Sequence, residues 1–312
     1  MARRLLAIVG PTATGKSEVG LLLAEMLGGE IVSADSMQFY RGMEIGTDKP
    51  TAEQRARVPH HLIDIIQPNE PFSVASYREL ADKALADIWR RGHQPILVGG
   101  SGLYVRALIY GLDLPVAPPD PELRRTLGEE AEREGKQALH ARLAAVDPEA
   151  AARIHYRNVT RVIRVLEVYH QTGRPISESW TLDPQASPRY NTRQFGLTLP
   201  RAELYRRTEE RVDQMLAAGL VEEVQGLLDQ GYGEDLVAMK GLGYAQIARY
   251  LREACGLDEA VRLLKRNTRR FAKRQLTWFR ADPHIEWLDV SEASGQAGAA
   301  KIIEEKWRPG CG

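Results

Sequence analysis

The octapeptide GPTATGKS at residues 10–17 constrains the fold more than any other part of this chain. Gly10 is separated by four residues from Gly15, Lys16 and Ser17, which is the spacing of a P-loop. In such a loop the glycines let backbone N–H groups close around phosphate oxygens, the lysine adds a positive charge, and the serine hydroxyl can reach a magnesium ion. The motif therefore predicts phosphate binding, but it does not say whether the phosphate is transferred, hydrolysed or released as a leaving group. The expected phosphate-binding residues are Gly10, Pro11, Thr12, Ala13, Thr14, Gly15, Lys16 and Ser17.

The sequence on either side of the motif has the pattern that a P-loop requires. The apolar run RLLAIV at 4–9 predicts a buried parallel strand. The run that begins at Lys16 predicts a helix, which Gly28 and Gly29 end. Because both flanking elements are present, a glycine-rich turn that matches by chance is a poor alternative. We expect the inward-facing side chains of this helix to be Val19, Leu22, Leu23, Met26 and Leu27.

Strand-like and helix-like segments then alternate, as they do in a doubly wound parallel sheet. The proline-rich stretch 111–123 interrupts this alternation, and residues 120–175 have a helical pattern throughout. We therefore expect an α/β fold, a parallel sheet flanked by helices, with an all-helical insertion domain. The expected core comprises 1–113 and 190–312, including basic C-terminal helices, and the insertion comprises 114–189. Further strands are expected at 30–35, 61–66, 94–100, 192–199 and 284–290, and a helix at 76–92.

Composition excludes several classes of protein. The chain has 312 residues, with 42 basic and 42 acidic side chains, so no overall field attracts it to nucleic acid. The two cysteines, Cys255 and Cys311, lie far apart, which disfavours a disulfide framework and a cysteine-based zinc site. No apolar stretch approaches the roughly 20 residues of a membrane span. We expect a cytoplasmic enzyme that has no membrane association.

A carboxylate follows the second expected strand. Asp35 stands at the end of that strand in SADSMQFY, and ligands gather at the carboxyl ends of parallel strands. An aspartate after a strand is also a common helix N-cap, and its position alone does not separate the two roles. Many P-loop ATPases have an aspartate at the end of another strand to hold magnesium. Here the strand at 94–100 ends in glycines, and Asp64 lies inside a run.

Two segments are basic in spite of the neutral total. Residues 262–280 contain eight lysines and arginines and no acid, with Phe271, Trp278 and Phe279 among them. Residues 153–164 add four arginines, again without an acid. Basic helices with interleaved aromatic residues suggest a clamp on a nucleic-acid backbone. The alternative is a solvated helix face, and the residues alone leave the two interpretations evenly balanced.

Six motifs together resemble one family. The chain is similar to the bacterial tRNA dimethylallyltransferases in the order and spacing of GPTATGKS, SADSMQFYRGMEIGTDKP, HHLIDI, GGSGLY, GLGY and RNTRRFAKRQLTWFR. The resemblance covers essentially the whole chain, and six motifs in order are highly specific. Ser17 and Ser101 stand where many relatives have threonine, so the hydroxyl is kept. The stretch at 158–164, NVTRVIR, is a looser match to the family's tRNA-contacting helix.

The resemblance implies a fold, a reaction and its partners. It implies a P-loop core like that of nucleoside triphosphate hydrolases and kinases, but with dimethylallyl diphosphate as the donor. The dimethylallyl group would be transferred to the exocyclic amine of the adenosine 3′-adjacent to the anticodon in tRNA, and diphosphate would leave. No nucleoside triphosphate is needed. The implied partners are the tRNA anticodon stem-loop, the donor and Mg²⁺ at Ser17, and the implied oligomeric state is a monomer.

The resemblance also assigns roles to residues of this chain. Asp35 would accept a proton from the adenine amine, while Lys16, Ser17 and Arg207 would stabilise the departing diphosphate. Arg211 lies one turn further along the same helix, and there we favour a solvated position. The tRNA-binding residues that the resemblance implies are Asp35, Ser36, Met37, Gln38, Ser101, Thr160, Arg161, Val162, Ile163, Arg164, Arg274 and Trp278.

Three other functions compete with this hypothesis. A P-loop nucleotide kinase is disfavoured because no arginine-rich lid pattern lies beside the glycine turn. A prenyltransferase acting on free AMP would leave the insertion and the basic C-terminal helix without a role. An NTP-dependent RNA-binding module would not need Asp35, since plain phosphate binding does not require that carboxylate.

Overall fold

The core of the molecule is a parallel sheet of six strands. The computed structural model describes residues 3–112, 117–180 and 187–308. The strand order is β3-β2-β4-β1-β5-β6, and every neighbouring pair is parallel. The predicted parallel α/β sheet is therefore confirmed. The strands are β1 (Arg4–Val9), β2 (Gly29–Ser33), β3 (His60–His61), β4 (Gln94–Gly99), β5 (Asn191–Thr198) and β6 (Ile285–Asp289).

The third strand is much shorter than the expected 61–66. It ends at His61 because Leu62 and Asp64 have positive φ angles, 62° and 56°, which an extended chain cannot accommodate. Beyond it, only an isolated bridge joins Ile66 to Tyr40. The prediction of a full strand here was wrong because an apolar run does not reveal left-handed residues within it.

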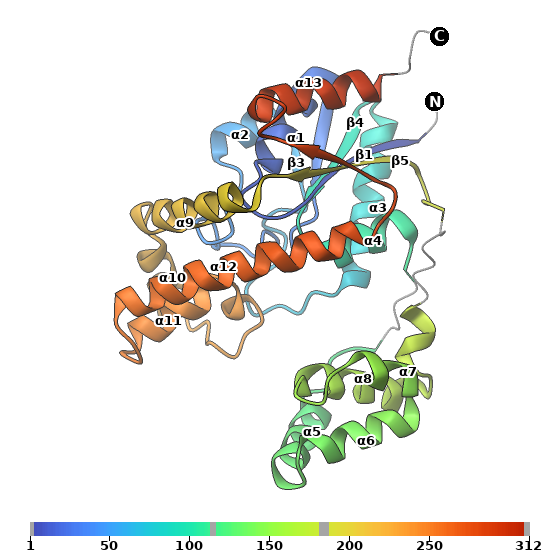
Figure 1. Ribbon diagram of the computed structural model, residues 1–312, viewed down its shortest axis with the longest axis vertical. Coiled ribbons are helices and arrows are strands. Elements are labelled where there is room, and N and C mark those ends of the chain that lie inside the picture. Colours follow the sequence, from blue (N-terminus) through green and yellow to red (C-terminus); the bar gives the residue numbers. More distant parts are fainter. Residues whose placement is uncertain (1–2, 113–116, 181–186, 309–312) are drawn as a thin grey trace. The chain divides into compact units, whose positions relative to one another are not determined.

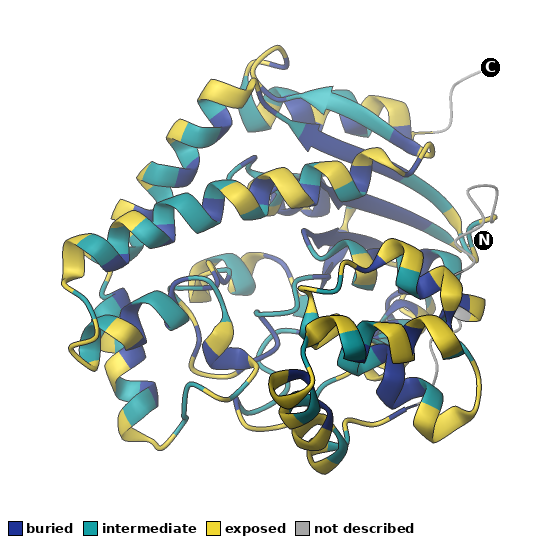
Figure 2. Cartoon of the chain, turned by 60° about the horizontal axis from the view of Figure 1, so that its bottom comes forward, coloured by how far each residue is buried: buried dark blue, intermediate teal, exposed yellow. Residues whose placement is uncertain are grey.

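Helices cover both faces of the sheet (Figure 1). Alternate residues of β1 point to opposite sides. Leu6 and Ile8 pack in one core with α1 and α13, whereas Leu5, Ala7 and Val9 pack in the other with α3, α4 and the end of α12. Figure 2 shows buried residues along the central strands and exposed residues on the outer sides of the helices. These helices are α1 (Lys16–Leu27), α3 (Val74–Arg90), α4 (Gly102–Tyr110), α12 (Leu257–Arg280) and α13 (Gly295–Trp307).

The buried face of α1 differs partly from the expected one. Val19 and Leu23 are buried as predicted, but Leu21 and Ala24 are buried as well. The other expected core residues, Leu22, Met26 and Leu27, are only partly buried. The physical reason is that α1 packs against both the sheet and α13, a helix that the sequence pattern did not predict.

A second group of helices extends the core beyond the sheet. Their side chains enclose Tyr244 and Leu220, and Tyr40 and Met43 of the chain after β2 pack among them. The basic helix α12 belongs to this cluster at one end and to the sheet at the other. The remaining elements of this part are α2 (Ala52–Arg57), α9 (Arg201–Ala217), α10 (Leu220–Asp229), η2 (Ala238–Lys240) and α11 (Tyr244–Leu251).

The chain divides into two compact units. One contains Met1–Tyr110 and Pro188–Gly312, and the other contains Gly111–Ser187. The described part of the second unit has its own apolar core, which includes Leu143 and Val162. Its elements are α5 (Pro121–Arg133), α6 (Lys136–Val146), α7 (Pro148–Arg153), α8 (Val159–Thr172) and η1 (Ile176–Trp180). Cys311, and parts of the linkers expected at 111–123 and 173–190, lie outside the described residues.

Candidate active site

The P-loop turns sharply between β1 and α1. Gly10, Ala13 and Gly15 all have positive φ angles, of 131°, 65° and 83°. A Cβ atom on Gly10 would lie 2.5 Å from the carbonyl oxygen of Leu197, so only glycine fits beside β5. Gly15 precedes α1 and provides no side-chain cap, so the first N–H groups of the helix have no side-chain acceptor there. These groups and the helix dipole make the turn an anion-binding site.

Lys16 is the cation of this turn. Its Nζ donates to the carbonyl oxygen of Pro11 at 2.7 Å, and the Thr14 hydroxyl donates to the same oxygen at 2.9 Å. Burial, together with the charge of Arg211, lowers the pKa of Lys16 to about 8, although the charges of Asp35 and Asp48 act in the opposite direction. A bound anion would compensate the cost of burying this ammonium group.

Asp35 follows β2 and caps a turn. Its Oδ1 accepts the backbone N–H of Met37 at 2.9 Å, and residues 36–39 form a turn rather than a helix, so the alternative of a helix N-cap is wrong. Within the described residues, Oδ2 accepts no hydrogen bond. Burial raises the pKa of the carboxyl group, and the charges of Lys16 and Arg211 oppose that rise. The carboxylate is thus a stronger base than an exposed aspartate.

One cavity of about 400 Å³ connects these groups. Its walls come from the P-loop, the turns after β2 and β4, α9 and α12. It brings together nine of the residues predicted for the donor, the base and the tRNA contacts. The predicted residues that line it are Thr12, Lys16, Ser17, Asp35, Ser36, Met37, Gln38, Ser101 and Arg274. Gly10, Pro11, Ala13, Thr14 and Gly15 shape the turn without lining the cavity.

The structure places Arg211, rather than Arg207, in the cavity. Arg207 donates from Nε to Glu203 on its own helix, at 2.7 Å, and does not line the cavity. Arg211 lines it and pairs with Asp48, with Nη1 and Oδ2 3.0 Å apart. Four residues advance a helix by slightly more than one turn, so the two side chains leave α9 in similar but distinct directions. The sequence could not show which one faces the P-loop.

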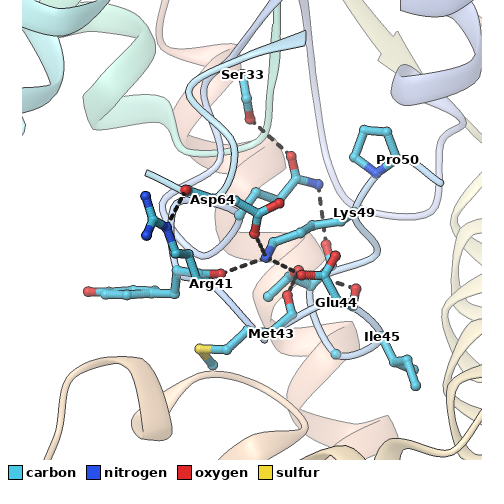
Figure 3. Close-up of polar contacts among 12 residues, drawn as sticks. Ser33, Arg41, Met43, Glu44, Ile45, Lys49, Pro50 and Asp64 are labelled. Atoms are coloured by element: carbon cyan, nitrogen blue, oxygen red, sulfur yellow. Dashed lines mark hydrogen bonds and ion pairs between the residues drawn. The ribbon is translucent and has the colours of Figure 1, made fainter. Parts of the chain in front are cut away.

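A network of hydrogen bonds fixes the chain that follows Asp35 (Figure 3). The ammonium group of Lys49, a side chain only 1% exposed, donates to the Tyr40 carbonyl at 2.6 Å, to Glu44 at 2.9 Å and to Asp64. Arg55 also pairs with Asp64, at 2.6 Å. Burial alone would raise the pKa of Asp64, but the hydrogen bonds from Lys49 and Arg55 outweigh it and hold that pKa below its ordinary value. Sequence reasoning gave no role to this network.

Gln38 also holds the chain that follows Asp35. Its Oε1 accepts from the Ser33 hydroxyl at 3.0 Å, and its Nε2 donates to the carbonyl oxygens of Thr47 and Asp48 at 3.3 and 3.1 Å. The amide that we expected to contact tRNA is therefore occupied by the protein.

Glu223 accepts hydrogen bonds from the loop between β2 and α2. Its carboxylate accepts the N–H groups of Glu44, Ile45 and Gly46 at 2.9, 2.7 and 3.1 Å, and the Tyr244 hydroxyl at 2.6 Å. A Cβ atom on Gly46 would lie 2.6 Å from the Tyr244 ring, so the loop approaches GLGY closely. Loop and motif thus form one wall of the cavity.

The basic helix α12 contributes five residues to the cavity: Leu264, Thr268, Phe271, Arg274 and Gln275. Trp278 lies outside it, half-buried against Gly102, with the Arg106 guanidinium carbon 5.3 Å from its ring centroid. Phe279 is buried in the core and is unavailable for stacking on a base. The aromatic residues of this segment therefore have three different environments.

The tRNA-binding residues predicted on α8 of the second unit lie on different faces of that helix. Thr160 and Arg161 of α8 are exposed, but Val162 is fully buried, and its side chain does not reach the surface in this structure. The reason is the amphipathic pattern of α8, which directs Val162 into the core and packs Ile163 against it. Arg164 donates to Glu167 at 2.6 Å and to the Ala117 carbonyl at 3.0 Å.

The fold and the site define a class: a P-loop enzyme in which a half-buried lysine and a carboxylate line one cavity beside a basic helix. A family model described as IPP transferase matches residues 38–282, and one described as isopentenyl transferase matches residues 3–64. The chain belongs to the IPP transferase family. No helix in the described residues has the length and apolar character to cross a membrane.

Relatives and solved structures resemble the chain over nearly its full length. A tRNA dimethylallyltransferase of Desulforudis audaxviator is 55% identical over 299 residues, covering 96% of each chain. The full-length tRNA isopentenylpyrophosphate transferase of Bacillus halodurans is 42% identical, with a TM-score of 0.68, covering 97% of this chain and 99% of that one. A eukaryotic dimethylallyltransferase acting on tRNA is 26% identical, with a TM-score of 0.75, covering 97% of this chain and 78% of that one.

Proposed function

We propose that this protein is a tRNA dimethylallyltransferase that uses dimethylallyl diphosphate. The dimethylallyl group passes to the exocyclic amine of the adenosine 3′-adjacent to the anticodon, and diphosphate leaves. The observation that carries the proposal is that Lys16 and Asp35 line the same cavity. The relatives named tRNA dimethylallyltransferase support the choice of tRNA and of the prenyl group.

The leaving group is stabilised by the P-loop. As the bond between the allylic carbon and the diphosphate oxygen breaks, negative charge grows on that oxygen. The N–H groups at the start of α1, the Lys16 ammonium and the Arg211 guanidinium lie where they can balance it. Arg211 takes the role that the sequence had suggested for Arg207, because it lines the cavity and Arg207 does not.

The nucleophile is activated by Asp35, which lines the same cavity. The nitrogen lone pair of the adenine amine forms the new bond to carbon, and one of its protons passes to Asp35. General base catalysis of this kind contributes about 100- to 10,000-fold. The hydrogen bond from Met37 holds one carboxylate oxygen, which leaves Oδ2 to take the proton.

Magnesium fits this site as a partner of the donor. Within residues 3–112, 117–180 and 187–308, no group of three or more His, Cys, Asp or Glu side chains could hold a metal. The Ser17 hydroxyl lines the cavity beside Lys16, so Mg²⁺ would be held by this hydroxyl together with diphosphate oxygens. When bound, the ion supplies positive charge to the leaving group.

The acceptor is a tRNA anticodon stem-loop, bound by a monomer in the cytoplasm. The target base must leave its stack to reach Asp35. Arg274 lies at the cavity on α12, where it can contact a phosphate of the RNA backbone. Thr160 and Arg161 remain candidates on the second unit because both are exposed.

The test is a transfer assay with radiolabelled dimethylallyl diphosphate and Mg²⁺, offered either tRNA or AMP, without ATP. Label in tRNA alone is expected. Label in AMP would instead identify a small-molecule prenyltransferase, and a strict requirement for ATP would point to a kinase or an NTP-dependent module. An anticodon stem-loop whose target adenosine is replaced by guanosine is the matched control, because it keeps the backbone and removes the exocyclic amine at that ring position.

A further inference from the structure

Gln275 joins three parts of the active site through one side chain. It lies on α12, is only 7% exposed, and points away from solvent toward the P-loop. Its Oε1 accepts the backbone N–H of Thr12 at 2.9 Å, and its Nε2 donates to the carbonyl oxygen of Gly100 at 2.9 Å. A single amide thus bridges the P-loop and the turn that follows β4.

The Gln275 side-chain amide packs closely against the backbone of Gly100. A Cβ atom on Gly100 would lie 2.4 Å from Nε2 of Gln275, which a side chain at that position could not tolerate. The Thr12 N–H belongs to the P-loop, yet its partner is Gln275. The site needs one acceptor and one donor at a fixed separation, and among apolar side chains, ionised carboxylates and amides only the amide offers both.

The turn that Gln275 holds also reaches the proposed base. Ser101, the residue after Gly100, accepts the N–H of Ser36 at 3.0 Å and donates to the Ser36 hydroxyl at 3.2 Å. Ser36 is the neighbour of Asp35. Hydrogen bonds, joined by the peptide bond between Gly100 and Ser101, therefore connect the P-loop through Gln275 to the segment that carries the carboxylate.

We propose that Gln275 is a positioning residue that fixes the diphosphate cradle and the base relative to each other and to the basic helix. The inference rests on the proposed function, in which those two sites act on the same pair of reacting atoms. Reacting groups that move apart by about 1 Å can lose about 100-fold in rate, so a support of this kind contributes to kcat more than to binding.

The first experiment compares Gln275→Met with Ala272→Gly. The methionine keeps the length of the side chain and loses both hydrogen bonds. Ala272 is buried on the same helix and its methyl group makes no hydrogen bond, so its replacement by glycine costs stability without removing a hydrogen bond to the P-loop. We expect kcat of Gln275→Met to fall by about 10- to 100-fold while KM for donor and tRNA changes much less. Ala272→Gly should retain wild-type kcat. Equal kcat values for the two variants would overturn the inference.

The second experiment uses Gln275→Glu and pH. A carboxylate still accepts the Thr12 N–H but places a charged oxygen against the Gly100 carbonyl, whereas a protonated carboxyl can donate to that carbonyl. Burial raises the pKa of such a carboxyl group. The activity of Gln275→Glu relative to wild type should therefore increase as the pH falls. A ratio that is constant with pH would contradict a positioning role.

Hydrogen exchange separates this inference from the proposed function. Backbone amides in peptides covering residues 10–17 and 35–38 should exchange faster in Gln275→Met than in Ala272→Gly. The comparison is made under conditions in which both variants have lost the same amount of thermal stability relative to wild type. Unchanged exchange refutes the hydrogen-bond series. A wild-type protein that transfers no label to tRNA refutes the proposed function, and the exchange result still decides the role of Gln275.

Discussion

Replacement of Asp35 by Asn tests the proposed base with little change to the fold. Asparagine keeps an oxygen at the position of Oδ1, so the hydrogen bond from the Met37 N–H survives. It replaces Oδ2 by an NH₂ group that cannot accept a proton. We expect transfer to fall by about 100- to 10,000-fold, the contribution of a positioned general base. The assay is single-turnover transfer of labelled dimethylallyl to tRNA at saturating substrates.

The thermal stability and the tRNA affinity of Asp35→Asn should not decrease along with its activity. The pKa of Asp35 is raised in the folded protein, so its charged form costs stability above that pKa, and the cost disappears as the pH falls. A neutral asparagine carries no such cost, and the thermal midpoint of Asp35→Asn at pH 7 should equal or exceed that of wild type. Affinity for tRNA should be nearly unchanged.

Asp48→Asn is the matched control for charge. Asp48 lines the same cavity, but its carboxylate pairs with Arg211 at 3.0 Å. Its loss should affect kcat far less than the loss of Asp35. If Asp35→Asn turned over at the wild-type rate, or if Asp48→Asn lost as much activity, the assignment of Asp35 as the base would be refuted.

Three further predictions concern the cations of the site. The kcat/KM of the free enzyme should rise with pH as Asp35 loses its proton and fall above about pH 8 as Lys16 loses its own; a profile flat from pH 7 to 10 would contradict this. Arg211→Gln should reduce transfer strongly and Arg207→Gln only slightly, because Arg207 pairs with its own helix; rates in the opposite order would restore the assignment made from the sequence. Lys49→Met should lower the free energy of unfolding by about 3 kcal/mol. This is the lower end of the cost of breaking a buried ion pair, because the carboxylates of Glu44 and Asp64 that pair with Lys49 are partly exposed. Urea denaturation measures this change, and a loss below about 1 kcal/mol, as for a surface pair, would refute the structural role.

Local sequence patterns were sufficient to predict the P-loop and most strands of the sheet. The P-loop could be predicted because its function depends on backbone geometry that glycines specify within eight adjacent residues. Asp35 could be placed in the cavity because the carboxyl ends of parallel strands share one edge of the sheet. Both inferences need only the order of elements along the chain.

The missed features depend on partners that are distant in sequence. The partner of Arg211 is Asp48, and the partners of Glu223 are the backbone of Glu44 to Gly46, so no local pattern indicates either. Val162 was grouped with the exposed residues because a basic helix was treated as one surface, although its apolar residues form a buried face. Periodicity could have separated Val162 from Arg161, whereas only the tertiary structure could separate Arg207 from Arg211.

The charges around the cavity explain how a neutral protein can hold an anion and still keep an effective base. Lys16 and Arg211 supply two positive charges, and Asp35 and Asp48 supply two negative ones, so this group of four is compensated before the donor binds. A bound diphosphate competes with both carboxylates for the same two cations. Once Lys16 and Arg211 pair with phosphate oxygens, they no longer lower the pKa of Asp35 to the same extent, and the diphosphate's own charge raises it. In the proposed reaction, donor binding would therefore make Asp35 a stronger base at the stage when the adenine amine must lose its proton. On this proposal the same two cations would link the departure of the leaving group to the activation of the nucleophile.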